Sequence, residues 1–240
     1  MKRIFFISLL LSATWFATAK ADSAHGDLPP AFTAVYTVKK AGLTLGDVNI
    51  SLRYDNQRYR YHKQTHSRGL LALFRKDVID ETSEGRIENG RLTMERYAYR
   101  HDNGRTRKEN TIQLVSAGRI HERYKGKAYD YRVPPNTLDR ASVEIALMRD
   151  ARRGSEKLTY TIAERGRSKT LEFLRVGQHA NMKTPAGNFA CTEYRVNRQS
   201  SKRSTTLCVA PELDYLPVTI THVEKGTSFT MRLKTYQPEG

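Results

Sequence analysis

Polar and apolar residues alternate along most of the chain, in runs separated by short polar turns. Examples of the apolar positions are Val48, Ile50 and Leu52, then Tyr59 and Tyr61, then Tyr97 and Tyr99. A period of two places such side chains on one face of a β-strand. Asn89-Gly90 and Asn103-Gly104 are hairpin signals, because Asn and Gly both tolerate positive φ. The pattern predicts a mainly antiparallel β protein of about a dozen strands.

One segment near the middle of the chain has helical spacing instead. Within residues 137–154, Val143, Ala146 and Leu147 recur at intervals of three and four. Either Thr137 or Asp139 can cap this helix. We therefore predict one central helix, about Asp139–Arg152, whose single apolar side packs against the sheet.

The amino terminus has the features of a secretory signal. Lys2 and Arg3 precede an apolar stretch at residues 4–17, which is too short to span a bilayer comfortably, and Ala19-Lys20-Ala21 is a small-x-small cleavage site. The alternative is an uncleaved anchor. We predict a signal peptide at residues 1–21 and a single antiparallel β domain at 22–240 in the periplasm.

The chain is strongly basic, with 41 Lys and Arg against 25 Asp and Glu and a net charge of +16. Losing Lys2, Arg3 and Lys20 with the signal peptide lowers this by three charges. Outside the cytoplasm the available polyanions are lipid headgroups, lipopolysaccharide and acidic polysaccharides, so we expect no nucleic acid partner. A solvated basic surface without a dedicated partner is the alternative.

Two cysteines, Cys191 and Cys208, flank a polar, turn-like stretch. If the chain folds back between Gln199 and Ser200, the two thiols lie directly opposite each other on paired strands. In an oxidising compartment this predicts a disulfide. A redox-active thiol is the alternative, but there is no C-x-x-C motif.

The inventory of reactive residues does not assemble into a catalytic site. There is no G-x-S-x-G, H-E-x-x-H or glycine-rich phosphate loop. The seven histidines lack the spacing of metal ligands, so we expect no metal site. With neither a catalytic motif nor a metal site in the sequence, we expect no enzyme and no cofactor. Thirteen tyrosines fill a core or line a lipophilic cavity. The candidate cavity-lining residues are Tyr59, Tyr61, Tyr97 and Tyr99.

Several segments, in their order along the chain, resemble one bacterial family, domain of unknown function 3108. They are "FTAVYTVKKAGLTLGDVNISL", "SRGLLALF", "DETSEGRIENGRLTMERYAYR", "LDRASVEIALMRD", "TPAGNFACTEYRV" and "YLPVTITHVEKG". The resemblance implies a secreted envelope protein with no established reaction. It also implies a fold similar to the LolA- and LolB-type lipoprotein carriers, in which a curved antiparallel sheet forms a half-barrel or open barrel over a cavity for acyl chains.

Five consecutive apolar residues, Leu70–Phe74, interrupt the alternation and are flanked by basic residues. One interpretation places the run at the rim of the half-barrel, where it contacts an acyl chain or a bilayer and the basic residues meet phosphates. The other is a strand across the core or a short helical plug. The residues of this candidate rim are Leu70, Leu71, Leu73, Phe74, Arg68, Arg75 and Lys76.

These observations favour a non-enzymatic periplasmic protein that binds a lipid or other amphiphile, anionic ones included, in a curved β-sheet cavity. Its role would be in envelope maintenance, with peripheral contact to a membrane. The alternative is an envelope assembly or interaction module that binds an acidic polysaccharide or a protein through its basic surface. A hydrolase with a non-obvious site is a third class.

Overall fold

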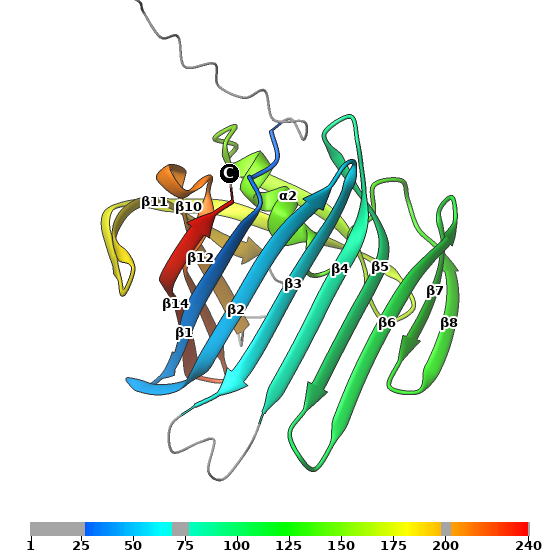
Figure 1. The fold of residues 1–240 in the computed structure, drawn as a ribbon, viewed down its shortest axis with the longest axis horizontal. Helices are drawn as coiled ribbons and strands as arrows, with labels where there is room; N and C mark the ends of the chain where they lie inside the picture. Colours follow the sequence, from blue (N-terminus) through cyan, green and yellow to red (C-terminus); the bar gives the residue numbers. More distant parts are fainter. Residues whose placement is uncertain (1–26, 69–76, 198–202, 240) are drawn as a thin grey trace, which may run out of the picture.

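The computed structural model describes residues 27–68, 77–197 and 203–239, most of which form one antiparallel sheet (Figure 1). Its strands are β1 (Phe32–Lys40), β2 (Leu43–Asp55), β3 (Arg58–Ser67), β4 (Val78–Glu88), β5 (Arg91–Asp102), β6 (Arg107–Ser116), β7 (Arg119–Tyr124), β8 (Lys127–Arg132), β9 (Lys157–Ala163), β10 (Ser168–Thr184), β11 (Gly187–Asn197), β12 (Arg203–Ala210), β13 (Leu216–Glu224) and β14 (Thr227–Pro238). The helix α2 (Ser142–Ala151) follows β8, and the short 3-10 helix η1 (Pro211–Leu213) follows β12. The predicted signal peptide lies outside the described residues.

Consecutive strands are neighbours throughout the sheet except at β8 and β9, between which the chain forms α2. The first and last strands, β1 and β14, also pair, so β8 and β9 are the two edge strands of the sheet, and Leu138 forms a short parallel bridge with β9. The helix α2 contacts both β5 and the distant edge strand β9. The sheet must therefore curve around the helix, as Figure 1 shows, and the predicted half-barrel with one central helix is confirmed.

Two of the hairpins show how local sequence fixes the turns. Asn89 and Gly90 join β4 to β5 with φ values of 52° and 70°, as expected for a two-residue turn. Asn103-Gly104 joins β5 to β6, but its turn is longer. The Oδ1 of Asn103 accepts the backbone N–H groups of Arg105 and Thr106, and of the two residues only Gly104 has positive φ. Both predicted hairpins are confirmed.

Asp139 caps α2. Its backbone carbonyl accepts the N–H of Val143, and its Oδ1 accepts those of Ala141 and Ser142 at 2.8 and 2.9 Å. The hydroxyl of Ser142 accepts the N–H of Asp139 in return, at 3.0 Å. This reciprocal arrangement is a capping box. The other predicted cap, Thr137, instead donates to the carbonyl of Pro134 in the preceding turn.

The helix is buried on more than one side, so the prediction of a single apolar face is wrong. Val143, Ala146 and Leu147 are buried as expected, but Ile145 and Met148 are also no more than 2% exposed. The reason is the curvature of the sheet. The side of α2 that would face solvent above a flat sheet faces another part of the same sheet here.

Glu122 on β7 links the edge strand β8 to the turn that follows the edge strand β9. It is 0% exposed, and its carboxylate accepts the backbone N–H groups of Arg165 and Gly166 in the β9–β10 turn, at 2.9 and 2.7 Å. It also accepts the hydroxyl of Tyr131 on β8, at 2.8 Å. Positive φ at Arg165 and Gly166 turns successive N–H groups toward one anion. We call this arrangement the seam latch.

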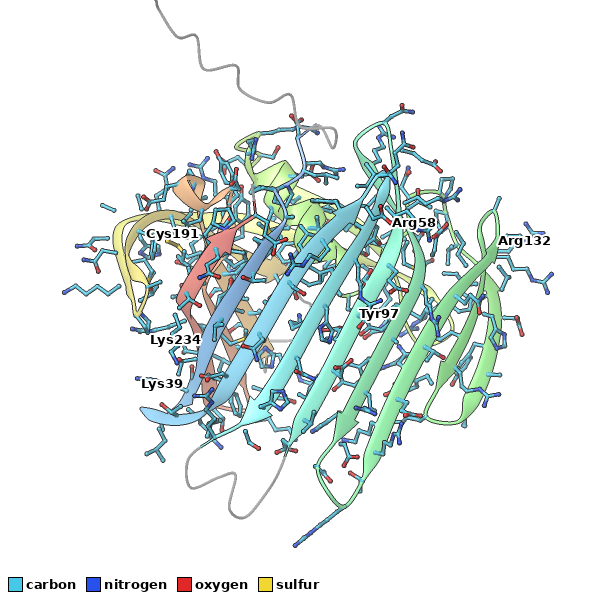
Figure 2. The ribbon with its side chains drawn as sticks, viewed as in Figure 1. Lys39, Arg58, Tyr97, Arg132, Cys191 and Lys234 are labelled. Carbon is cyan, nitrogen blue, oxygen red and sulfur yellow. A yellow bond between two sulfur atoms is a disulfide. The ribbon has the colours of Figure 1, made fainter. Side chains whose placement is uncertain are left out.

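The predicted disulfide is confirmed. Cys191 on β11 and Cys208 on β12 are bonded, with their Cα atoms 5.4 Å apart (Figure 2). The predicted register is wrong by two residues, because Cys208 faces Glu193 and the cysteines are diagonal neighbours. A shift of two residues keeps every side chain on its face of the sheet. The pattern of polar and apolar residues therefore could not distinguish the two registers.

Candidate functional site

The strands β5 and β6 separate at one end of the sheet (Figure 1). Their pairing runs from Asp102 opposite Arg107 to Arg96 opposite Gln113 and stops there. Beyond this point residues 91–94 pair only with β4, and the end of β6 pairs only with β7. A hollow of about 1020 Å³ lies between the diverging ends and the segment that leads from β8 toward α2. We call it the β5–β6 groove.

Apolar side chains line much of the β5–β6 groove. They are Met94, Leu114, Val115, Ile120, Val133, Pro134 and Pro135. Val115 is 51% exposed, and in the described part of the chain only Leu43 and Val176 are also large, hydrophobic and exposed. It lies where the register between β6 and β7 shifts, and such a bulge redirects a side chain. Val115 therefore extends the apolar surface of the groove into solvent.

Three arginines surround this apolar surface: Arg86, Arg96 and Arg132. Arg86 already forms an ion pair, because its Nε lies 2.7 Å from a carboxylate oxygen of Glu95. Arg96 and Arg132 form no ion pair with any residue that the structure describes. Figure 2 shows Arg132 at the outer margin of β8. Both guanidinium groups are free to bind a carboxylate or a phosphate, which arginine can do with two parallel hydrogen bonds.

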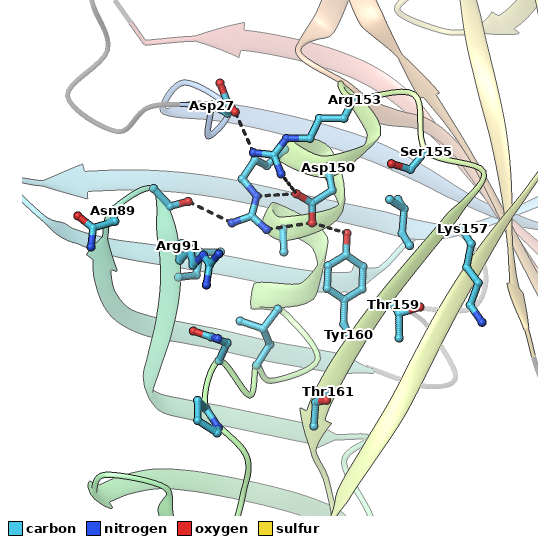
Figure 3. Close-up of a pocket in the computed structure, with 18 residues that line it drawn as sticks. Asp27, Asn89, Arg91, Asp150, Arg153, Ser155, Lys157, Thr159, Tyr160 and Thr161 are labelled. Atoms are coloured by element: carbon cyan, nitrogen blue, oxygen red, sulfur yellow. Dashed lines mark hydrogen bonds and ion pairs between the residues drawn. The ribbon is translucent and has the colours of Figure 1, made fainter.

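A second hollow, of about 840 Å³, lies across the same connecting segment from the groove and is drawn in Figure 3. Asp150 is its centre. This carboxylate accepts hydrogen bonds from Arg149 at 2.7 and 2.9 Å and from the hydroxyl of Tyr160 at 3.1 Å, and Arg153 bridges it to Asp27. These charges satisfy one another. The network ties the end of α2 to β9, and we assign it a structural role.

A third cavity, of about 450 Å³, lies on the concave face near the start of α2, and we call it the interior cavity. A row of side chains crosses five neighbouring strands along its wall, each facing the next: Lys63, Glu81, Tyr99, Asn110 and Tyr124. Further lining residues come from the turn before α2, from its first turn and from the β9–β10 turn: Arg140, Glu144, Glu164 and Arg165.

Buried and half-buried charges on one side of the interior cavity form a cluster. The Nζ of Lys63 lies 2.5 Å from Glu144 and 3.1 Å from Glu81. Tyr61 donates to Glu144 at 2.7 Å, and Tyr97 donates to Glu81 at 2.6 Å. Burial alone would lower the pKa of Lys63, but the carboxylates of Glu144 and Glu81 outweigh it and raise that pKa. Burial would likewise raise the pKa of Glu81, but Lys63 and the Tyr97 hydroxyl hold it below its ordinary value.

Asp139 is a buried carboxyl group near these cavities whose pKa is raised. It is 0% exposed, and burial raises its pKa to about 6 against the opposing hydrogen bonds from Ser83 and Ser142. Such a pKa is typical of a general acid or base. However, Asp139 caps α2 and lines none of the three cavities described above. We therefore assign Asp139 a structural role as a buried helix cap, and its raised pKa to that burial.

All four tyrosines named from the sequence point toward the concave side. Tyr97 and Tyr99 line the interior cavity. Tyr59 and Tyr61 are each 2% exposed and pack in the core, where Tyr59 shares a hydrogen bond with Ser83. Whether any of them contacts a ligand stays a prediction.

The candidate rim falls almost entirely outside the described residues. This applies to Leu70, Leu71, Leu73, Phe74, Arg75 and Lys76. Arg68 is described, and its Nε lies 2.7 Å from the buried carboxylate of Asp47. In this structure the Arg68 guanidinium is therefore already paired with a carboxylate of the protein.

The sequence pattern did not reveal the polar groups that face inward. Lys63, Glu81 and Glu122 occupy positions that alternation assigns to apolar side chains. A signal was available for Lys63, because it has the same parity as Tyr59 and Tyr61 on one strand. No comparable signal marks Arg96 and Arg132, whose importance depends on where β5 and β6 separate.

Five of the described histidines each lie within 4 Å of one carboxylate: His62 of Asp80, His101 of Asp77, His121 of Asp130, His179 of Glu193 and His222 of Glu224. Within the described ranges no three His, Cys, Asp or Glu side chains are grouped so that they could hold a metal ion. None of the described helices has the length and apolar character needed to cross a membrane.

Comparison with solved structures gives a similar fold. A crystal structure from Brucella abortus, described as a beta-barrel-like protein of domain of unknown function DUF1849, matches with a TM-score of 0.58 and 11% sequence identity. The match covers 88% of this chain and 99% of that one. Comparison with curated proteins finds no match. The likeness supports the curved, barrel-like architecture and says nothing about a ligand.

The comparison with family models agrees with the resemblance seen in the sequence. The model of a protein of unknown function, DUF3108, matches residues 33–234, which run from β1 into β14. The fold-level similarity to LolA- and LolB-type carriers stays a prediction. Because the family model spans most of the chain and nearly the whole sheet, this protein belongs to the DUF3108 family.

Proposed function

We propose that this protein is a non-enzymatic periplasmic protein that holds an anionic amphiphile, such as a lipid, in the β5–β6 groove. The observation that carries the proposal is the combination, in one hollow, of an apolar lining with two arginines that have no ion pair among the described residues. An amphiphile needs apolar surface for its chain and cations for its headgroup. Val115 and the two arginines, Arg96 and Arg132, are the residues we expect it to contact.

The size of the groove suits such a ligand. Small-molecule pockets have volumes of about 300–1,000 Å³, and the groove, at about 1020 Å³, is at the upper end of that range. The concave side of the sheet is a poorer place for an acyl chain. It is filled by α2, and the interior cavity that remains is lined by charged side chains and tyrosines.

The predicted location and the net charge are consistent with this function. A signal peptide at residues 1–21 would deliver the protein to the periplasm, where anionic lipids are available. The net charge, +16 for the whole chain and three less without the signal peptide, favours approach to an anionic membrane surface. We infer that the protein contacts the membrane peripherally and contributes to envelope maintenance.

Titration calorimetry with lysolipids below their micellar concentration tests the proposal. We expect lysophosphatidylglycerol, which is anionic, to bind more tightly than zwitterionic lysophosphatidylcholine. Val115→Asp should abolish binding of both, because it places a charge on the apolar surface. The matched control is Val176→Asp, which alters an exposed valine of β10 that does not line the groove.

The arginines have their own test. The double variant Arg96→Ala/Arg132→Ala should weaken lysophosphatidylglycerol binding by about tenfold and leave lysophosphatidylcholine unaffected. The control is Lys39→Ala/Lys234→Ala, which removes the same charge from β1 and β14 (Figure 2). Equal losses in both double variants would show that net charge, and not the groove, attracts the lipid.

A further inference from the structure

We infer that the interior cavity is a second binding site, and that it takes an acidic sugar unit, either carboxylated or phosphorylated. The cavity shares no lining residue with the β5–β6 groove. Binding at either place can therefore fail without affecting the other.

The first observation is a buried acceptor without a donor. Asn110 on β6 is 6% exposed, and its Oδ1 has no hydrogen-bond partner in the described structure. A buried carbonyl in this condition has lost its water and gained nothing in exchange. Asn110 lines the interior cavity. A hydroxyl group of a ligand bound there would supply the missing donor.

The second observation is that several cations of the cavity have no ion pair among the described residues. The four carboxylates that line the cavity, Glu81, Glu109, Glu144 and Glu164, are all paired with cations. Lys108, Lys125 and Arg165 line the same cavity and form no ion pair with the described residues. Lys125 and Arg165 lie over the ring of Tyr124, at 5.5 and 5.1 Å from its centre. The cations without a carboxylate partner among the described residues therefore favour an anion.

The third observation is the placement of two aromatic rings around the acceptor. Tyr99 faces Asn110 from β5, and Tyr124 faces it from β7. Neither tyrosine hydroxyl has a hydrogen bond to a described residue. The ring of Tyr99 offers an apolar face with a polar tip beside the amide, and Tyr124, whose ring lies under Lys125 and Arg165, adds a second polar tip.

Together these groups select the ligand class. A sugar ring has an apolar face for a tyrosine and hydroxyl groups for Asn110, and a carboxylate or phosphate on it would reach the lysines. Free phosphate has no apolar face, and a fatty acid has no hydroxyl groups for the amide. The volume of about 450 Å³ is within the range of pockets for small ligands, about 300–1,000 Å³.

Titration calorimetry with three probes tests this inference on the full-length mature protein. The probes are trigalacturonate, glucose 1-phosphate and neutral maltotriose. We expect one or both acidic probes to bind and maltotriose not to bind. Binding of trigalacturonate alone would identify a carboxylated sugar, and binding of glucose 1-phosphate alone a phosphorylated one.

Two variants separate binding from folding. Asn110→Leu should weaken the acidic probe by about tenfold without lowering the thermal unfolding temperature, because the replaced oxygen makes no hydrogen bond. Lys108→Ala/Lys125→Ala changes two exposed lysines and should weaken it at least as much. Lys39→Ala/Lys234→Ala is the matched control and should change nothing.

Three results would overturn the inference. The first is absence of binding by both acidic probes at millimolar concentration. The second is equally tight binding of maltotriose. The third is an equal loss of affinity in the two double-lysine variants, because that would show attraction by net charge alone.

Discussion

In both parts of the curved sheet, side chains alternate between the inward and the outward face, but the inward side chains differ in character between the two parts. In β1, β2 and β12–β14 the inward side chains are apolar and fully buried, as at Phe32, Leu52, Val209, Val218 and Leu233, each 0% exposed. In β3–β7 the inward positions include Lys63, Glu81, Asn110 and Glu122. Buried polar groups destabilise a fold unless they are paired. The first part is thus a packed scaffold, and the second retains groups and cavities suited to binding.

Breaking the charged cluster should show this difference most strongly. Lys63→Met leaves the carboxylates of Glu81 and Glu144 without their cation, and we expect it to lower the free energy of unfolding by about 3–5 kcal/mol. Adding Glu81→Gln and Glu144→Gln should restore much of this loss, because the amides still accept the tyrosine hydroxyls. Urea denaturation measures both. A loss that neutralisation does not reverse would assign Lys63 a packing role instead.

Removing the disulfide tests the scaffold. Cys191→Ala/Cys208→Ala opens a loop with a sequence separation of 17 residues, and we expect the free energy of unfolding to fall by about 3 kcal/mol. Affinity for lysophosphatidylglycerol should not change, because the groove lies in the other part of the sheet. A matching loss of affinity would show that the two parts are not independent.

The cap of α2 predicts a pH effect of definite sign. The pKa of Asp139 is about 6 in the folded protein, against an ordinary value of 3.8. The folded state therefore holds this proton more tightly than the unfolded state does. The resulting stabilisation is present below about pH 4 and is lost as the pH rises through about 6.

The Asp139→Asn variant isolates that effect, because asparagine keeps an acceptor for the helix N–H groups and does not titrate. Relative to this variant, the natural protein should lose up to about 3 kcal/mol between about pH 4 and pH 7. Urea denaturation across the pH range measures the difference in free energy of unfolding between the two proteins. The contributions of the other titrating groups are the same in both proteins and cancel in this difference. Parallel pH curves for the two proteins would contradict the assignment.

The seam latch should have a smaller and more local effect. Glu122→Gln directs an amide N–H₂ toward backbone donors, and we expect it to lower the free energy of unfolding by about 1–3 kcal/mol. Hydrogen exchange at the amides of Arg165 and Gly166 should accelerate. Asp130→Asn, an exposed carboxylate on β8, is the control and should cost less than about 0.5 kcal/mol. Unchanged exchange in Glu122→Gln would mean that the edges are held by other contacts.

Local sequence patterns were sufficient for the strands, the helix, the hairpins and the cysteine pair, because each depends on residues close together in the chain. The inward charges could not be predicted in the same way. Lys63 and Glu144 are 81 residues apart, and their contact depends on how the sheet curves around α2. The β5–β6 groove depends on where the pairing of two strands stops. The pattern of polar and apolar residues does not indicate that point.

Native mass spectrometry tests the central claim, an anionic amphiphile in the β5–β6 groove, most directly. The protein is exported to the periplasm with its own amino-terminal segment, purified without detergent, and compared under native and denaturing conditions. We predict an added mass that dissociates on denaturation, is recovered as acidic lipid, and is absent from Val115→Asp but present in Val176→Asp. A protein with no added mass, or lipid lost equally from both variants, would contradict it.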